Sequence, residues 1–426
     1  MENIYCNLQQ IQLATPGTMH DTPRGGRLHI AFLGRRNAGK SSLINALTGQ
    51  NLAIVSPVAG TTADPVYKSM EILPIGPVVL IDTAGLDDTG ELGRKRVAKS
   101  LAVLEKTDLV LLVVDPLQGF GEVEQQVMDT AVQKQVPLLA VINKSDLLPE
   151  PDTFSFGLPD VPRVAVSGLT GQGIGELKQA LSKLAPKDWT APAIAGDLLP
   201  PGELALLVVP IDLAAPKGRL ILPQVQTIRD LLEHDCLIMV VKETELQTAL
   251  QRLPQPPALV ITDSQVFARV DADTPPGVPM TSFSILFARY KGDLTTLVAG
   301  ALAVDDLRPG DPVLIAEACT HHRVADDIGT VKIPRWLRQN VGGELDFHWS
   351  SGIELPPDLA KYKLIVHCGA CMINRREMLS RMMTARAAGV PIVNYGVLIA
   401  YMHGILRRTL GPFPEVLAML DEKGMD

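Results

Sequence analysis

The sequence predicts an α/β fold in which parallel sheets are repeated along the chain. Short apolar runs of the kind that form buried strands alternate with helix-like segments over most of its length. Hydrophobic residues make up 46% of the chain and aromatic residues only 4%, so the cores must consist mainly of Leu, Val, Ile and Ala, a composition typical of α/β domains. At 426 residues the chain is too long for one ordinary domain, and we expect three.

Stretches rich in proline, alanine and glycine mark the expected boundaries. We expect a mobile leader at 1–26, a first domain at 27–188, a second at 202–270 and a third at 280–426. In the second domain we expect strands at 204–209, 236–241 and 258–262 and helices at 225–232 and 243–253. Nothing in this domain carries chemistry, and Cys236 is expected to be a buried apolar thiol. The second domain is therefore predicted to be a dimerisation module.

The charge and the cysteine count exclude some classes of protein. The formal net charge of -8 and the pI near 5.6 argue against nucleic acid as the main partner, because such proteins usually carry a basic surface. No apolar run approaches the roughly 18 residues needed to cross a bilayer, and the N-terminus lacks a signal-peptide pattern, so we expect a cytoplasmic protein. Five cysteines, an odd number, do not indicate a disulfide framework.

The first domain begins with a phosphate-binding pattern. The residues from Gly34 to Ser41 have the spacing G-x-x-x-x-G-K-S and lie between the apolar run 28–33 and a helical pattern at 41–47. Gly34 and Gly39 permit the backbone to wrap around a phosphate group. Lys40 then reaches the β- and γ-phosphates of the nucleotide, and Ser41 ligates Mg²⁺. Within this loop, Asn37, Ala38 and Ser42 are also expected to contact the nucleotide. A glycine-rich turn between a strand and a helix is the alternative.

Two further loops have the features of nucleotide switches. In the loop 56–64, Thr62 is the candidate to sense Mg²⁺ and the γ-phosphate, with Thr61 in reserve. The expected strand 78–81 leads to Asp82-Thr83-Ala84-Gly85, in which Asp82 holds the Mg²⁺ shell and the N–H of Gly85 contacts the γ-phosphate. The predicted catalytic residues are therefore Lys40, Thr62, Asp82 and Gly85.

Base selection is predicted from two loops that follow later strands. Asn143-Lys144-Ser145-Asp146 comes after the apolar run 137–142, and the Asp146 carboxylate can accept both the ring N–H and the exocyclic amine of guanine. Ser167 and Gly168 follow the strand 164–166 and lie where a backbone N–H contacts the guanine oxygen. Four such loops in this order favour GTP over ATP. The sequence thus predicts a P-loop GTPase domain followed by two smaller α/β domains with parallel sheets.

These motifs, over roughly residues 27–185, resemble the GTPases of the TrmE-Era group. The chain departs from that group at Ala63, where arginine is frequent, and at Gly168, where alanine is usual. Leu86 follows Gly85, at the position where Ras-like enzymes carry the glutamine that orients the attacking water. The resemblance implies a K⁺ ion placed by Asn37 as the source of positive charge, whereas the alternative is that Asn37 is only a turn residue.

Two cysteine-histidine clusters follow expected strands of the third domain. Cys319-Thr320-His321-His322 comes after the run 312–316, and His367-Cys368-Gly369-Ala370-Cys371 comes after 362–366. Parallel strands place both clusters at the carboxyl edge of a sheet, where sites form. We expect Cys371 to open a helix that runs to residue 388 and directs its positive end at the thiolates. The pattern predicts a metal site, although a C-x-x-C alone could be a redox pair, half a zinc site or chance.

The residues alone do not decide which metal this site binds. Zinc accepts three cysteines and one histidine in a closed tetrahedral site. A cubane iron–sulfur cluster normally takes four thiolates, and the three here would leave one iron with a weak or exchangeable ligand.

A TrmE-Era-like GTPase followed by C-x-H, about 45 residues and H-C-x-x-C resembles the HydF family, the GTPase maturation factors of FeFe-hydrogenase. The resemblance covers essentially the whole chain. It implies GTPase, dimerisation and cluster-binding domains in that order, with a 4Fe–4S cluster on Cys319, Cys368 and Cys371. His321 and His367 match the histidines of the motif. It further implies a homodimer that receives a di-iron precursor from two radical-SAM maturases and transfers it to apo FeFe-hydrogenase. His322 and His348 are near only in sequence, and His403 is predicted to lie in the core.

Two other functions remain open at this point. One is a GTPase of ribosome or tRNA assembly, against which the acidic pI and the lack of an RNA-binding module count. The other is a zinc-stabilised regulatory GTPase. The colour and metal content of anaerobically purified protein distinguish all three.

Overall fold

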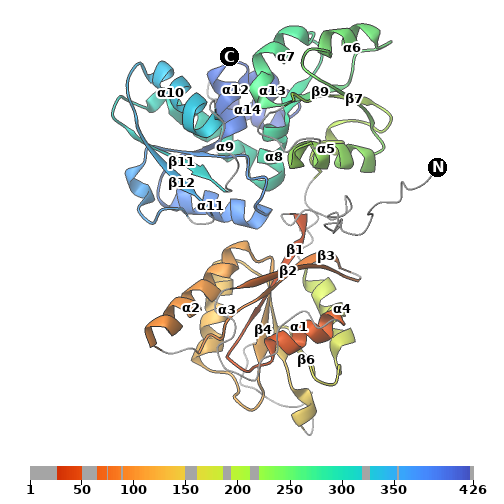
Figure 1. The fold of residues 1–426 in the computed structure, drawn as a ribbon, viewed down its shortest axis with the longest axis vertical. Coiled ribbons are helices and arrows are strands. Elements are labelled where there is room, and N and C mark those ends of the chain that lie inside the picture. Colours follow the sequence, from red (N-terminus) through yellow and green to blue (C-terminus); the bar gives the residue numbers. More distant parts are fainter. Residues whose placement is uncertain are drawn as a thin grey trace, which may run out of the picture.

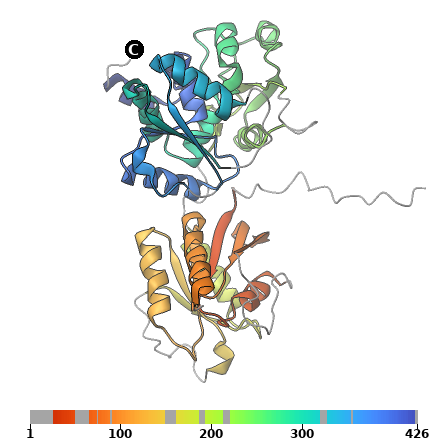
Figure 2. The ribbon, with the colours of Figure 1, turned by 60° about the vertical axis from the view of Figure 1, so that its left-hand side comes forward.

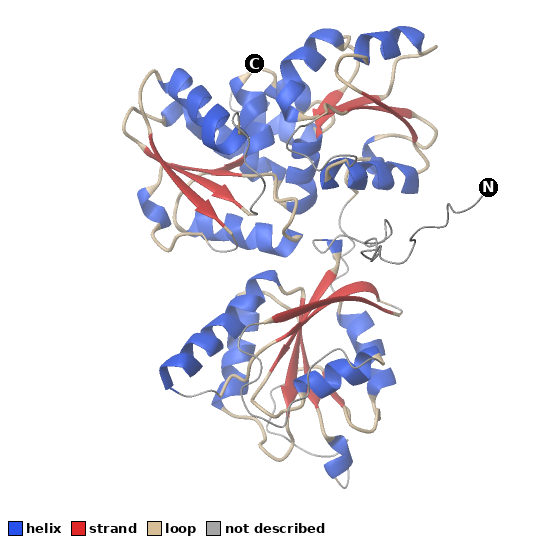
Figure 3. Cartoon of the chain, viewed as in Figure 1, coloured by secondary structure: helices blue, strands red, loops and turns tan. Residues whose placement is uncertain are grey.

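The computed structural model describes residues 26–49, 65–73, 75–87, 90–148, 161–185, 193–211, 220–318, 327–352 and 355–422. The chain forms two bodies, one built from the first domain and one from the second and third domains together (Figure 1). Each of the three sheets is flanked by helices, as expected for α/β domains (Figure 3).

The first domain has a six-stranded sheet with the order β2-β3-β1-β4-β5-β6, parallel except for the β2-β3 pair. Alternate residues of the fully buried β1 enter different cores: Ile30 and Phe32 face α1 and α4, whereas Ala31 and Leu33 face α3 and η2. The elements are β1 (Leu28–Leu33), α1 (Lys40–Thr48), β2 (Val66–Ile72), β3 (Gly76–Asp82), α2 (Gly90–Ala102), η2 (Val103–Lys106), β4 (Leu109–Val114), α3 (Glu122–Gln133), β5 (Leu138–Ile142), η3 (Ser145–Leu147), β6 (Arg163–Ala165) and α4 (Ile174–Leu184).

The second domain has a parallel four-stranded sheet with the order β10-β9-β7-β8. The predicted strands and helices are present, but the two boundaries predicted around this domain differ from the structure. Ile194, Ala195 and Leu199, placed in a linker by their proline-rich surroundings, are buried in the core. The elements are η5 (Gly196–Leu198), β7 (Leu204–Val208), α5 (Leu222–Glu233), β8 (Leu237–Val241), α6 (Leu246–Arg252), β9 (Leu259–Thr262), η6 (Ser264–Val266), α7 (Phe267–Asp273), β10 (Met280–Ser282) and α8 (Phe283–Lys291).

The predicted boundary at 271–279 falls inside this sheet. β10 pairs in parallel with β9, and α8 follows β10 directly, so residues 280–291 continue the second domain rather than open the third. The prolines there form a loop between strands of one sheet, which a composition rule cannot distinguish from a linker.

The third domain has a parallel four-stranded sheet with the order β12-β11-β13-β14. Its elements are α9 (Leu294–Leu302), η7 (Ala303–Asp306), β11 (Pro312–Glu317), the π-helical turn η8 (Ile328–Lys332), α10 (Ile333–Val341), β12 (Asp346–Ser351), η9 (Leu359–Lys361), β13 (Leu364–His367), α11 (Arg375–Ala387), β14 (Ile392–Asn394), α12 (Tyr395–Met402), α13 (Leu406–Thr409) and α14 (Pro414–Glu422).

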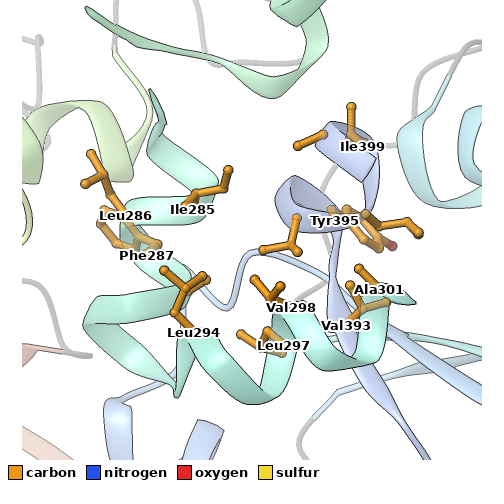
Figure 4. Close-up of a cluster of buried hydrophobic side chains, with 14 of the residues drawn as sticks. Ile285, Leu286, Phe287, Leu294, Leu297, Val298, Ala301, Val393, Tyr395 and Ile399 are labelled. Atoms are coloured by element: carbon orange, nitrogen blue, oxygen red, sulfur yellow. The ribbon is translucent and has the colours of Figure 1, made fainter. Parts of the chain in front are cut away.

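The second and third domains share one hydrophobic core. Side chains of α8, α9 and α12 meet at their junction, among them Leu286, Leu297 and Ile399 (Figure 4). Because burial of these side chains is common to both sheets, we expect the pair to behave as one folding unit.

The first domain contacts this unit through α11. In both views α11 lies on the side of the upper body that faces the first domain (Figures 1 and 2). Asn374 Nδ2 donates to the Lys106 carbonyl at 2.9 Å, and Arg376 donates to the Lys134 carbonyl. The contact therefore joins η2 and the end of α3 to the first turn of α11.

No helix in the described part of the chain has the length and apolar character needed to cross a membrane.

Candidate functional site

The P-loop has the conformation that its spacing predicts. It leaves β1 after Leu33, and α1 begins at Lys40, capped by Gly39 with φ of 89°. Asn37 also has a left-handed backbone, with φ of 61°. Lys40 Nζ donates to the carbonyls of Gly34 at 3.0 Å and Arg35 at 2.8 Å, so its ammonium group lies over the loop. This arrangement suits a phosphate because N–H groups and a cation converge on one point.

Ser41 and Asp82 meet where the Mg²⁺ ligands were predicted. Ser41 Oγ donates to Asp82 Oδ2 at 2.8 Å. Asp82 Oδ1 is buried without a hydrogen-bond partner among the described residues, and burial raises the pKa of this carboxyl. A buried carboxylate oxygen without a partner fits a role in the ligand shell of a divalent cation. Thr61 and Thr62 lie outside the described residues.

Asn143 joins the base loops to the P-loop. Its Nδ2 donates to the Ala38 carbonyl at 2.9 Å, and its Oδ1 accepts from the Gly168 N–H at 2.9 Å. A Cβ on Gly39 would come within 2.2 Å of the same Nδ2, so this position must be glycine for the bridge to form. Asn143 thus fixes the relative positions of the phosphate and guanine loops.

The other base-loop residues lie in the loops that Asn143 connects. Lys144 Nζ pairs with the buried carboxylate of Asp115 at 2.6 Å, a partner that the sequence analysis missed. Ser167 Oγ accepts the N–H of Thr170 at 3.1 Å and holds its loop closed. Asp146 is exposed in η3, where its carboxylate can meet a base.

The residue at the position of the Ras-type glutamine is buried. Leu86 is 7% exposed and belongs to the core beneath α3. Gly85 lies against the P-loop, since a Cβ there would come within 2.8 Å of the Arg36 N. The switch after β3 thus meets the phosphate loop with backbone at Gly85 and with the side chain of Asp87, whose Oδ1 accepts the Arg36 N–H at 2.6 Å.

The two cysteine clusters follow strands of one parallel sheet, as predicted, and the structure shows that these strands are neighbours. β11 and β13 pair in parallel, with Ala316 opposite His367, so both strands end at one edge of the sheet. The N–H of Ala318 donates to Cys368 Sγ at 3.2 Å. Burial raises the pKa of the Cys368 thiol, while the N–H groups of Ala318 and Ala370 act in the opposite direction. Cys319, His321 and His322 lie outside the described residues.

The helix after the second cluster begins later than predicted. α11 begins at Arg375 with Asn374 as its N-cap, because Ala370 has φ of 55° and the segment from Cys368 to Ile373 forms a loop. Cys371 is therefore in the loop and does not open the helix. The helical periodicity could not show this, because it does not register a single left-handed residue.

His367 uses both ring nitrogens within the protein. It is fully buried, and Arg381 Nη1 lies 2.8 Å from Nε2. Since arginine only donates, Nε2 accepts, and Nδ1 donates to the Cys368 carbonyl at 2.8 Å. Burial, then the Arg381 charge, lowers the pKa of His367 to about 4. The geometry gives no support to His367 as an iron ligand.

His403 and His348 are not arranged as metal ligands either. His403, predicted to lie in the core, is exposed at the end of α12, where it stacks edge-on against Trp336. His348 pairs with Asp346 on β12. Among the described residues, which include only two of the three predicted cysteine ligands, no group of three or more His, Cys, Asp or Glu is placed to hold a metal ion.

The fold and these sites define a P-loop GTPase domain followed by two α/β domains with parallel sheets. Residues 29–144 match the model of the 50S ribosome-binding GTPase family. Residues 194–292 match the hydrogen maturase F dimerization domain, and residues 295–412 match its tetramerization domain. These last two models together cover more than half of the chain, and the chain belongs to the hydrogen maturase F family.

Similar proteins confirm the class of the first domain. The tRNA modification GTPase MnmE of Nitrosomonas europaea is 40% identical over 171 residues, which are 40% of this chain and 37% of that protein. MnmE of Bordetella petrii is 37% identical over 159 residues, 37% of this chain and 34% of that protein. The chain thus spans little more than a third of the length of these relatives.

Among solved structures, Era of Aquifex aeolicus is 20% identical and has a TM-score of 0.34, covering 50% of this chain and 93% of that chain. A bacterial selenocysteine-specific elongation factor is 24% identical with a TM-score of 0.30, covering 37% and 28%.

Proposed function

We propose that this protein is a GTP-hydrolysing scaffold that holds a 4Fe–4S cluster on Cys319, Cys368 and Cys371 and delivers a di-iron precursor to apo FeFe-hydrogenase. The observation that carries the proposal is the pairing of β11 with β13, which brings the C-terminal ends of the two strands that precede the cysteines to one sheet edge. Membership of the hydrogen maturase F family supports the same reading.

The surroundings of Cys368 suit an anionic cluster. Its sulfur is buried and accepts the N–H of Ala318, and hydrogen bonds of this kind stabilise cluster-bound thiolates and tune their potential. Cys371 is partly exposed, so one side of the loop is open to incoming molecules. When bound, the cluster would supply an iron with an exchangeable ligand, because only three thiolates are available to it.

The first domain would drive the cycle by GTP hydrolysis. Lys40 would neutralise the β- and γ-phosphates, while Ser41 and Asp82 would hold Mg²⁺ together with Thr62. Gly85 would sense the γ-phosphate through its backbone N–H, and Asp146 would select guanine. With Leu86 in the core, the positive charge that promotes hydrolysis would come from a K⁺ ion held by Asn37.

The partners would be two radical-SAM maturases, which supply the di-iron precursor, and the apo-hydrogenase, which receives it. We propose a homodimer formed through the second domain. Its edge strand β8 exposes Leu237 by 59% and Val240 by 45%, an apolar edge of the kind that pairs with another chain. Sedimentation of the wild-type protein and of Leu237→Lys tests this contact, since a variant that stays fully dimeric would exclude it.

The deciding experiment is anaerobic reconstitution with iron and sulfide, followed by metal analysis, absorption and EPR. We expect a brown protein that loses most of its iron in Cys319→Ala, Cys368→Ala and Cys371→Ala, because two thiolates seldom retain a cubane. Cys236→Ala is the matched control, since it removes a buried thiol of the second domain and should keep the cluster.

Three outcomes would overturn the scaffold. A full iron complement in Cys368→Ala would exclude the ligand set. A colourless protein with zinc would favour a zinc-stabilised regulatory GTPase, and co-purifying RNA without either metal would favour a GTPase of ribosome or tRNA assembly. Activation of apo-hydrogenase by the loaded wild-type protein, and not by the three cysteine variants, tests delivery.

A further inference from the structure

A buried lysine from the second domain holds the cysteine loop of the third. Lys291 is the last residue of α8 and is 2% exposed. Its Nζ donates to the carbonyls of Ala370 at 3.1 Å, Cys371 at 3.0 Å and Ile373 at 2.6 Å. These carbonyls cover the turn from the second cysteine to the start of α11, so one ammonium group orders the whole turn.

Arg375 makes the reverse contact. As the first residue of α11, it donates through Nη1 to the carbonyls of Arg289 at 3.2 Å, Tyr290 at 2.7 Å and Gly292 at 3.2 Å, at the C-terminal end of α8. Each element thus places a cation on the carbonyls of the other, and α8 and α11 are in contact. The cysteine loop is fixed from two sides.

The hydrogen bonds themselves define the charge of Lys291. Three carbonyl acceptors require three N–H donors, which an ammonium group has and a neutral amine lacks. A buried ammonium ion is costly unless an anion lies near it. Burial lowers the pKa of Lys291 to about 8, whereas Cys371, Glu377 and Cys368 act in the opposite direction when they are charged. Cys371 and Cys368 would be thiolates in the loaded protein, so the loaded site would supply the anion that a buried ammonium group needs.

Resting on the cluster-binding function proposed above, we propose that Lys291 is a positioning residue of the iron–sulfur site that supplies the counter-charge to the bound cluster. Three thiolates would outweigh the positive charge of a 4Fe–4S core, so the bound cluster would be anionic, and one-electron reduction would add a further negative charge. A fixed ammonium group beside Cys371 stabilises the reduced form more than the oxidised form, and so raises the midpoint potential. It also favours retention of the cluster, because its charge offsets the net negative charge that the loaded site would carry in a buried environment.

The alternative is that Lys291 only orders the backbone of the cysteine loop and that its charge has no effect on the cluster. Substitution of Arg375 distinguishes these two roles. Arg375→Gln weakens the same clamp from the other side, but its guanidinium lies on α8 and not on the cysteine loop. Lys291→Gln removes the charge and keeps an amide donor, while Lys291→Arg keeps the charge. Lys361→Gln is the control, because Lys361 is a half-exposed lysine of the same domain paired with Asp358.

The experiment uses the full chain, reconstituted anaerobically, with iron and sulfide analysis and an EPR-monitored redox titration of each variant. We expect Lys291→Gln to lose most of its iron on gel filtration and to shift the midpoint potential of the remaining cluster to more negative values. Lys291→Arg, Arg375→Gln and Lys361→Gln should keep the wild-type potential. Urea unfolding of the same samples, followed by circular dichroism, reports whether the shared core of the second and third domains is folded.

Different outcomes would refute the counter-charge role of Lys291 and the scaffold function on which it rests. A Lys291→Gln protein with the wild-type potential and iron content refutes the counter-charge, as does an Arg375→Gln protein with the same negative shift. If Lys291→Gln does not fold, Lys291→Arg decides between the two roles. This variant keeps the positive charge, so a midpoint potential well below that of the wild-type protein would overturn the proposal. A wild-type chain that takes up no iron and sulfide refutes the scaffold function itself.

Discussion

The nucleotide site and the cysteine site both lie at the carboxyl ends of parallel strands, but they are built differently. All described residues of the nucleotide site come from the first domain, and Asn143 connects its loops within that domain. The cysteine loop lies in the third domain, is held by Lys291 of the second, and continues into the helix that contacts the first. The nucleotide site is therefore self-contained, whereas the geometry of the cysteine site depends on all three domains.

The largest expected effect tests the independence of the nucleotide site. Lys40→Ala should reduce GTP turnover by roughly 10²-fold or more, because the phosphates lose their preorganised cation. Iron uptake should be unchanged, since Lys40 lies in the P-loop of the first domain, where it donates to the carbonyls of Gly34 and Arg35, and the cysteines belong to the third domain. Parallel measurement of phosphate release and iron content checks both statements. A matched loss of iron would show that the two sites are not separable.

Base choice should change without any effect outside the first domain. Asp146→Asn places a donor opposite the guanine donors, a mismatch of about 1–3 kcal/mol, or roughly 5- to 150-fold in relative affinity. The variant should prefer xanthosine triphosphate, whose 2-oxo group accepts from the new amide. Competition binding with the two nucleotides measures this preference. Retained preference for GTP would remove Asp146 from the base site.

The potassium site is tested best with glycine at position 37. Asn37 has φ of 61°, so alanine would add backbone strain to the loss of the side chain, whereas glycine adopts this conformation freely. Turnover of Asn37→Gly in potassium should fall to its rate in sodium, while the wild-type protein should be faster in potassium. Steady-state rates in matched salts decide. Equal rates of the wild-type protein in both salts would leave Asn37 as a turn residue.

Substitutions at the contact between the first domain and α11 should have smaller effects than substitutions in either site. Asn374 accepts the Glu377 N–H as the N-cap of α11 and donates to the Lys106 carbonyl of the first domain. Asn374→Ala should cost about 1–2 kcal/mol of unfolding free energy, and Asn374→Asp less, because aspartate keeps the cap and loses only the bond between domains. Urea denaturation of both variants measures the difference. Equal losses would assign the whole effect to the junction.

The smallest expected effect is a pH dependence at the same junction. Burial raises the pKa of Glu377 above its ordinary value of 4.5, and its Oε1 is buried without a hydrogen-bond partner among the described residues. A raised carboxyl pKa gives stability that is complete below 4.5 and is lost as the pH rises through the folded pKa. Glu377→Gln lacks this loss. Its stability relative to wild type should therefore increase with pH, which unfolding midpoints at several pH values would show. A constant difference would mean that Glu377 is charged in the folded protein throughout.

By itself, the sequence determined the α/β class, the buried strands that precede the motif loops of the first domain, and the alternation of strands and helices from β7 to β9 in the second. These features are local: glycines fix the P-loop backbone, apolar runs define buried strands, and strand ends in parallel sheets coincide. The same rules also brought the ends of β11 and β13 together, although which residues beside Cys319 and Cys368 would support them stayed unknown.

Only the tertiary structure decided the surroundings of these loops. Lys291 is 79 residues from Ala370, and nothing in the pattern of α8 distinguishes this lysine from one that faces solvent. The late start of α11, the exposure of His403 and the inclusion of β10 in the second sheet were also decided by packing. Periodicity tells which face of an element is apolar, but not which distant element covers it, because that choice depends on the summed burial and hydrogen bonding of the whole core.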